Sequence, residues 1–85
     1  MSALDAALRR FRARPSSATA RHEVAKQILW LLMRWRVARG CEPDHRTLAP
    51  SVRRALQIIE FRRATSVSEA VRIVKDAALA ERLLP

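Results

Sequence analysis

The 85-residue chain is strongly basic, with 17 Lys and Arg residues against 8 Asp and Glu residues and a formal net charge of +9. Its apolar fraction of 49% excludes a disordered basic tail and predicts a single small folded domain over residues 1–85. This excess of positive charge favours nucleic-acid phosphates or an acidic protein surface as the partner, because counterion release and long-range attraction stabilise such contacts.

Few residues could support catalysis, metal binding or insertion into a membrane. The one cysteine, Cys41, excludes an internal disulfide and is typical of a cytoplasmic protein. Cys41 and His45 are too few ligands for a structural zinc site, and the single glycine excludes a glycine-rich phosphate loop. No apolar run approaches the ~20 residues of a transmembrane helix, and no signal peptide is recognisable. We therefore expect no enzymatic activity, metal, cofactor, small-molecule substrate or membrane contact.

Four helical segments are predicted, with breaks at residues 15–17, 40–44 and 65–66. The first covers about residues 2–13, and Ser2 and Asp5 have the spacing of a capping box. Leu4, Leu8 and Phe11 form one narrow apolar stripe on it. Residues 1–15 either belong to the domain or form a separate N-terminal helix or arm.

The second predicted helix, about residues 17–39, ends at Gly40 and is apolar on two sides. One stripe consists of Val24, Ile28, Leu31, Trp35 and Ala38. The opposite stripe consists of Trp30, Met33 and Val37. The first helix could fold back and cover this second stripe, or the stripe could bind a partner or a second copy of the chain. We favour the first alternative, because a small domain needs its central helix buried.

The third predicted helix begins at Thr47 or Ala49 and runs to about Arg63. Its inward residues are Leu48, Val52, Ala55, Leu56 and Ile59. The fourth begins at Ser66, where Ser66 and Glu69 form a full capping box, and continues to about Leu83. Its inward residues are Val67, Ala70, Val71, Val74, Ala78 and Leu79. The prediction is an all-α domain in which the third and fourth helices form a helix-turn-helix or, alternatively, a plain antiparallel pair.

In a helix-turn-helix, the first residues of the fourth helix would enter the major groove of DNA. The candidates for base contact are then Ser68, Glu69 and Arg72. The candidates for phosphate contact are Arg46, Arg53, Arg54, Arg62 and Arg63, with Arg9, Arg10, Arg12 and Arg14 as a supporting arm. The charge is nevertheless concentrated elsewhere: residues 1–39 have a balance of +7, whereas residues 66–85 are neutral.

Three stretches carry a family resemblance: Trp30 to Arg36, Leu48 to Leu56, and Ser66 to Ala70. Together they resemble the extended-turn helix-turn-helix domain of proteobacterial conjugative-element regulators of the FseA and QseM type. The resemblance covers about residues 25–74, and this chain has Ala64-Thr65 where the family's turn commonly has glycine. It implies a domain that binds DNA through a basic face or binds another regulator through a different face. An antiactivator of this type would be acidic, so the net charge favours DNA binding.

The leading functional prediction is therefore a small, dimeric, bacterial transcription regulator that binds duplex DNA through its arginines. The alternative is an adaptor or antiactivator that binds and inhibits another regulator through Trp30, Met33 and Val37. RNA binding is a third reading, and the scarcity of aromatic residues disfavours it.

Overall fold

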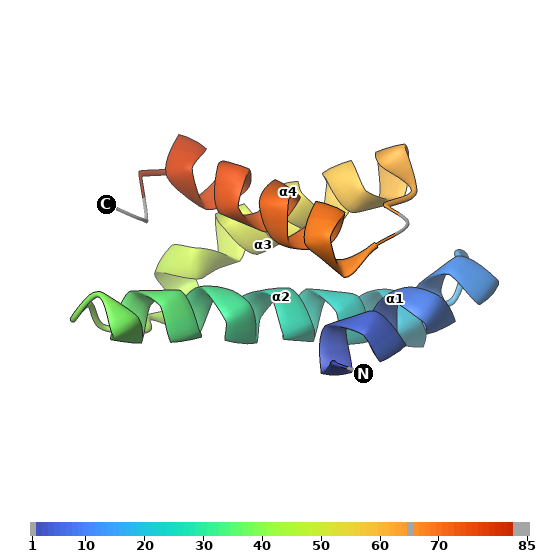
Figure 1. Ribbon diagram of the computed structural model, residues 1–85, viewed down its shortest axis with the longest axis horizontal. Coiled ribbons are helices and arrows are strands. Elements are labelled where there is room, and N and C mark those ends of the chain that lie inside the picture. The colour runs from blue at the N-terminus through green and yellow to red at the C-terminus, as the bar shows by residue number, and fades with distance from the viewer. Residues whose placement is uncertain (1, 65, 83–85) are drawn as a thin grey trace.

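The computed structural model describes residues 2–64 and 66–82, which form four α-helices and no β-strand (Figure 1). Helix α1 covers Ala3–Ala13, α2 covers Ala18–Ala38, α3 covers His45–Arg62 and α4 covers Val67–Ala80. The predicted all-α fold is confirmed.

Helix α2 is the long axis on which the other helices pack. Its 21 residues extend about 32 Å, close to the longest dimension of the molecule, 36 Å. Helix α1 has 11 residues and runs back along the N-terminal half of α2 (Figure 1). Because α1 is about 16 Å long, it leaves the C-terminal half of α2 uncovered.

Helix α3 packs against both α2 and α4, and α4 crosses in front of it in Figure 1. All five predicted inward residues of α3 are buried, which confirms its inner face. The α4 side of the core is made mainly of small residues, since Ala70, Ala77 and Ala78 are 2% exposed or less. Helix α1 joins the same core through Leu4, Ala7, Leu8 and Phe11.

The helix N-termini follow the capping signals in the sequence. Ser2 and Ser66 accept hydrogen bonds from the backbone N–H groups of residues three positions later, at 3.1 and 3.2 Å, as the two capping boxes predict. Helix α3 begins earlier than the prediction of Thr47 or Ala49. Asp44 is its N-cap, accepting from the backbone N–H of Arg46 at 3.0 Å, so the helix starts at His45 and Pro50 lies inside it.

The first apolar stripe predicted on α2 is only partly correct. Val24 and Ile28 are fully buried, but the fully buried residue that follows them is Leu32; Leu31 and Trp35 are only partly buried, and Ala38 is exposed. The buried residues therefore follow a strict i, i+4 row, which is the ridge that packs into neighbouring helices.

The favoured expectation that α1 covers the Trp30 side of α2 is wrong. Trp30 is 50% exposed and Val37 is 60% exposed, while Met33 is partly buried. The physical reason is the short length of α1, which ends its contact with α2 before this stretch is covered.

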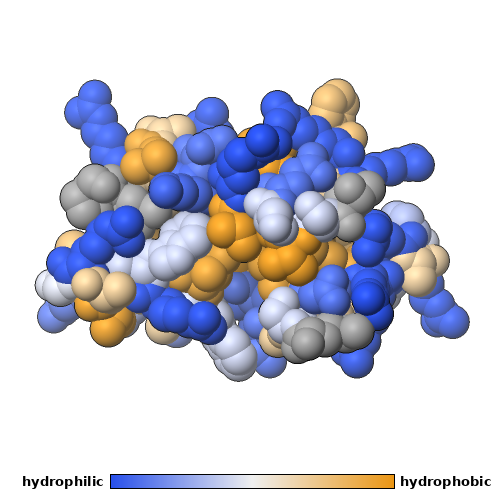
Figure 2. Space-filling model, viewed as in Figure 1, coloured by the Kyte–Doolittle hydropathy of each residue, from blue (hydrophilic) through white to orange (hydrophobic). Residues whose placement is uncertain are grey.

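Helix α4 also differs from its prediction. Leu79, expected inward, is 45% exposed, whereas Ile73 and Ala77 are buried. The helix ends at Ala80 rather than at about Leu83, a residue that lies outside the described part of the chain. Helix α4 makes only limited contact with α1 and α2. Figure 2, viewed as in Figure 1, shows apolar side chains at the surface in the middle of the molecule.

The link between α3 and α4 turns without a glycine. Arg63 caps α3 in the left-handed conformation, with φ of 49°, and the N–H of Ala64 bonds to the carbonyl of Ile59 at 3.2 Å. Left-handed geometry is normally supplied by glycine, so a side chain here carries backbone strain. Thr65, the second residue of the expected turn, lies outside the described residues, and a helix-turn-helix arrangement of α3 and α4 stays a prediction.

Adjacent glycine substitutions at the end of α3 should have opposite effects. Arg63→Gly relieves the left-handed strain and should raise the free energy of unfolding by about 0.5–1 kcal/mol. Arg62→Gly removes the same charge but places the glycine inside the last helical turn, so it should lower the free energy of unfolding by about the same amount. Urea unfolding followed by circular dichroism measures both. A loss of stability in Arg63→Gly would contradict the strain at this position.

Ser51 is the one buried polar residue among the described residues. It is 0% exposed and its hydroxyl has no hydrogen-bond partner there. A buried hydroxyl without a partner costs stability because it has lost its hydrogen bonds to water.

Ser51→Ala should therefore raise the free energy of unfolding by about 1 kcal/mol. Ser66→Ala is the matched control: it removes the hydroxyl that caps α4 and should lower the free energy of unfolding by about 1 kcal/mol. Both are read from the urea midpoint. Destabilisation by Ser51→Ala would show that its hydroxyl is paired in solution.

Candidate nucleic-acid interface

The arginines predicted to contact phosphate lie on the exposed side of α3. Arg46, Arg53 and Arg54 all point away from the buried inner face. Arg54 is within 3.9 Å of Glu81, beyond the end of α4, but both side chains are more than a third exposed, so this pair is weak. Arg46 and Arg53 form no ion pair with any described residue.

Two further residues complete this surface, and sequence reasoning assigned no role to either. Gln57 is exposed between Arg53 and the C-terminal end of α3, and Phe61 is 90% exposed one turn later. Their helical spacing could have placed both residues on this surface, because Arg53, Gln57 and Phe61 follow one another at intervals of four residues. An exposed phenylalanine on its own is ordinary; its position among these polar residues is informative.

A cleft of about 640 Å³ at the C-terminal end of α3 brings together two groups of predicted site residues. Arg12 comes from α1 and Arg63 from the cap of α3, while Phe11 and Ile59 provide apolar walls. Glu60 also lines the cleft, but its carboxylate forms an ion pair with Arg21 of α2, with 2.6 Å between Oε1 of Glu60 and Nε of Arg21. The cleft therefore keeps a positive balance and suits an anion such as a phosphate.

A second hollow, of about 280 Å³, lies between α2 and α3. Ala25, Leu29, Ala49 and Val52 contribute its apolar surface. The positively charged residues around it are Lys26 and Arg53, and both histidines of the chain, His22 and His45, also line it. Its α3 residues share a helical side with Ile59, Glu60 and Arg63, which line the cleft of Arg12 and Arg63.

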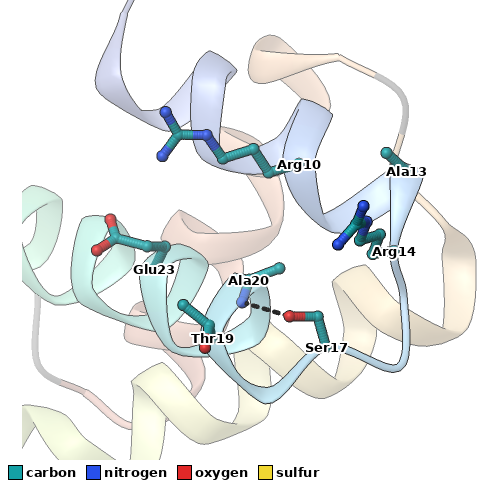
Figure 3. Close-up of a pocket in the computed structure, with 7 residues that line it drawn as sticks. All are labelled: Arg10, Ala13, Arg14, Ser17, Thr19, Ala20 and Glu23. Atoms are coloured by element: carbon teal, nitrogen blue, oxygen red, sulfur yellow. Dashed lines mark hydrogen bonds between the residues drawn. The ribbon is translucent and has the colours of Figure 1, made fainter.

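The other α1 arginines are less favourably placed for phosphate. Arg9 is paired with Asp5 at 3.7 Å. Arg10 and Arg14 border a hollow of about 310 Å³ between the end of α1 and the start of α2, and Figure 3 shows Glu23 on its opposite side. Ser17 lies in the same hollow, where its hydroxyl accepts from the N–H of Ala20 and caps α2. A carboxylate facing these arginines reduces the attraction of this hollow for an anion.

The candidates on α4 form a weaker patch. Ser68 and Arg72 are exposed near its N-terminus, whereas Glu69 is partly buried and its N–H bonds to the Ser66 hydroxyl. The outer side of α4 adds Lys75 but also Asp76. The charge of α4 is thus mixed, in contrast to the three arginines on the outer side of α3.

The Trp30 side of α2 is a second candidate surface, and it adjoins the hollow between α2 and α3 at Lys26. The ammonium of Lys26 lies 5.0 Å from the centre of the Trp30 ring, which is cation–π distance. Trp30 and Val37 remain half or more exposed. An exposed tryptophan beside a basic residue and a partly buried methionine has the composition of a protein-binding surface.

At the start of α3, hydrogen bonds from the N–H of Arg46 and the hydroxyl of Thr47 lower the pKa of the Asp44 carboxyl group. This is the effect of helix capping and concerns no catalytic group. The described residues contain no cluster of three metal-binding side chains and no helix with the length and apolarity needed to cross a bilayer.

Comparison with protein-family models, curated proteins and solved structures found no match to this chain. The resemblance to the conjugative-element regulators stays a prediction. Any functional assignment consequently depends on the surfaces described above.

Proposed function

We propose that this protein is a small transcription regulator that binds duplex DNA through an arginine-rich surface centred on α3. The observation that carries the proposal is the exposed position of Arg46, Arg53 and Arg54 on one side of α3, away from the core. Arg62 is exposed at the end of the same helix, and Arg63 lines a cleft with Arg12 of α1. Guanidinium groups spread along one side of a helix can contact successive phosphates and displace their counterions.

The double variant Arg53→Ala/Arg54→Ala should bind duplex DNA more weakly than the unchanged protein. Each phosphate contact contributes about −0.9 to the slope of log K against log salt, so the slope should become shallower by about 2. Fluorescence anisotropy with a random-sequence duplex at several salt concentrations measures affinity and slope together.

The matched control is Arg34→Ala/Lys75→Ala, which lowers the net charge equally but alters exposed residues of α2 and α4. It should leave the salt slope unchanged and reduce affinity only slightly, through weaker long-range attraction. Equal losses in the two double variants would show that only total charge matters. No binding of the unchanged protein at low salt would overturn the proposal.

The exposed Trp30 supports a second candidate function, an adaptor or antiactivator that binds another regulator. Trp30 and Val37 lie outside the cover of α1, and the adjacent Lys26 favours an acidic partner. Tryptophan at the centre of an interface is a frequent hot spot, because its large ring excludes water on both sides. The same surface could join two copies of the chain in a homodimer, although the charge of +9 opposes self-association.

Trp30→Ala should weaken partner binding at least about 30-fold without unfolding the protein, because a tryptophan hot spot contributes about 2 kcal/mol or more. The tagged chain is expressed in the organism that encodes it, and proteins that copurify with it are compared between variants. Leu79→Ala is the control, since Leu79 is similarly exposed, at 45%, but on α4. If a regulator still copurifies with Trp30→Ala, the Trp30 surface is not its binding site. Sedimentation of the purified chain tests whether the same surface forms a homodimer.

A further inference from the structure

Helix α3 presents one continuous exposed stripe opposite its buried face. The stripe consists of Arg46, Pro50, Arg53, Arg54, Gln57 and Phe61, and all six residues are exposed. Their spacing of four, three, one, three and four residues keeps them on one side of an α-helix. A helix that enters the major groove of DNA needs such a side, free of contacts with its own domain.

Within this stripe, two residues have the chemistry for reading bases. The amide of Gln57 has both a donor and an acceptor, and this combination matches N7 and the N6 amino group of adenine. The ring of Phe61 can pack against the C5-methyl group of thymine, the one apolar group in the major groove. The two residues are four positions apart, about 6 Å along the helix axis, so their contacts would fall one to two base pairs apart.

The surroundings of the stripe fit a sugar-phosphate backbone. Lys26 of α2 and Arg53 line one hollow, and Arg12 of α1 and Arg63 line one cleft. Lys26 also lies 4.0 Å from the carboxylate of Glu23, and the 43% exposure of its side chain keeps this pair weak. Positive groups from neighbouring helices thus accompany α3 beside its middle and at its C-terminal end. The outer side of α4 has no comparable set, because Asp76 lies among its two basic residues and Glu81 is paired with Arg54.

We propose that α3 is the base-reading helix, with Gln57 recognising an adenine and Phe61 a nearby thymine methyl group in the major groove. Arg46, Arg53 and Arg54 then contact the backbone on either side. This inference rests on the proposed binding of duplex DNA and assigns specificity to α3, in place of Ser68, Glu69 and Arg72 of α4.

The first experiment compares the sequences that variants select from a pool of random duplexes. The unchanged chain should enrich a motif with an adenine and, one to two base pairs away, a thymine. Gln57→Ala should lose the preference for that adenine and Phe61→Ala the preference for that thymine, with the rest of the motif retained. Both side chains are exposed, so neither change should disturb the fold. Ser68→Ala/Arg72→Ala, which alters α4, should select the original motif.

The second experiment removes the thymine methyl group alone. Replacing that thymine by uracil in the selected duplex should weaken binding by the unchanged chain about fourfold, the effect of one buried methyl group. Phe61→Ala should bind the thymine and uracil duplexes equally. A uracil effect of the same size in Phe61→Ala would overturn the assignment of this side chain.

The outcomes separate this inference from the function on which it rests. If the unchanged chain binds no duplex at low salt, both fail. If it binds duplexes but enriches no motif, or if the α4 variant changes the motif while Gln57→Ala and Phe61→Ala leave it intact, the base-reading role of α3 is overturned and DNA binding stands.

Discussion

The packing of α3 against both α2 and α4 is the constraint on which the rest of the structure depends. One side of α3 buries Leu48, Ile59 and neighbouring apolar residues, and this contact holds α2 and α4 in one core. Small residues on the α4 side allow the two helix backbones to approach closely, where tight packing adds dispersion contacts. Because one side of α3 serves both neighbours, its other side remains open to solvent along its length.

The separation of a buried side and an exposed side makes α3 available for binding. The polar side is free of core packing, so its arginines, Gln57 and Phe61 are available to a ligand at little cost in stability. Residues of α1 and α2 add to the arginines of α3, at the cleft that Arg12 and Arg63 line and at the hollow that Lys26 and Arg53 line. The basic surface is therefore a product of three helices. The Trp30 surface on α2 is distinct from it in composition and offers a different kind of contact.

The length of α1 decides how much of α2 that second surface includes. An 11-residue helix folded back on a 21-residue helix covers only part of it, and the uncovered part includes Trp30 and Val37. Periodicity showed that α2 is apolar on two sides but could not show how far a neighbour extends along either side. Leu79 is exposed for a different reason: it lies three and four residues after Asp76 and Lys75, on the outer side of α4 and opposite its buried residues.

The sequence by itself determined that the chain forms four helices, that Ser2 and Ser66 cap two of them, and which face of α3 is buried. These features depend on interactions within a few residues, such as the hydroxyl of Ser66 accepting from the N–H of Glu69, or on an unambiguous periodicity. Only the tertiary structure decided which side of α2 is covered and which arginines converge. Arg12 and Arg63 are distant in sequence, and they line one cleft because the C-terminal end of α1 lies near the C-terminal end of α3. The exposure of Phe61 was likewise settled by packing, since an apolar residue near a helix end can face either way until its neighbours are in place.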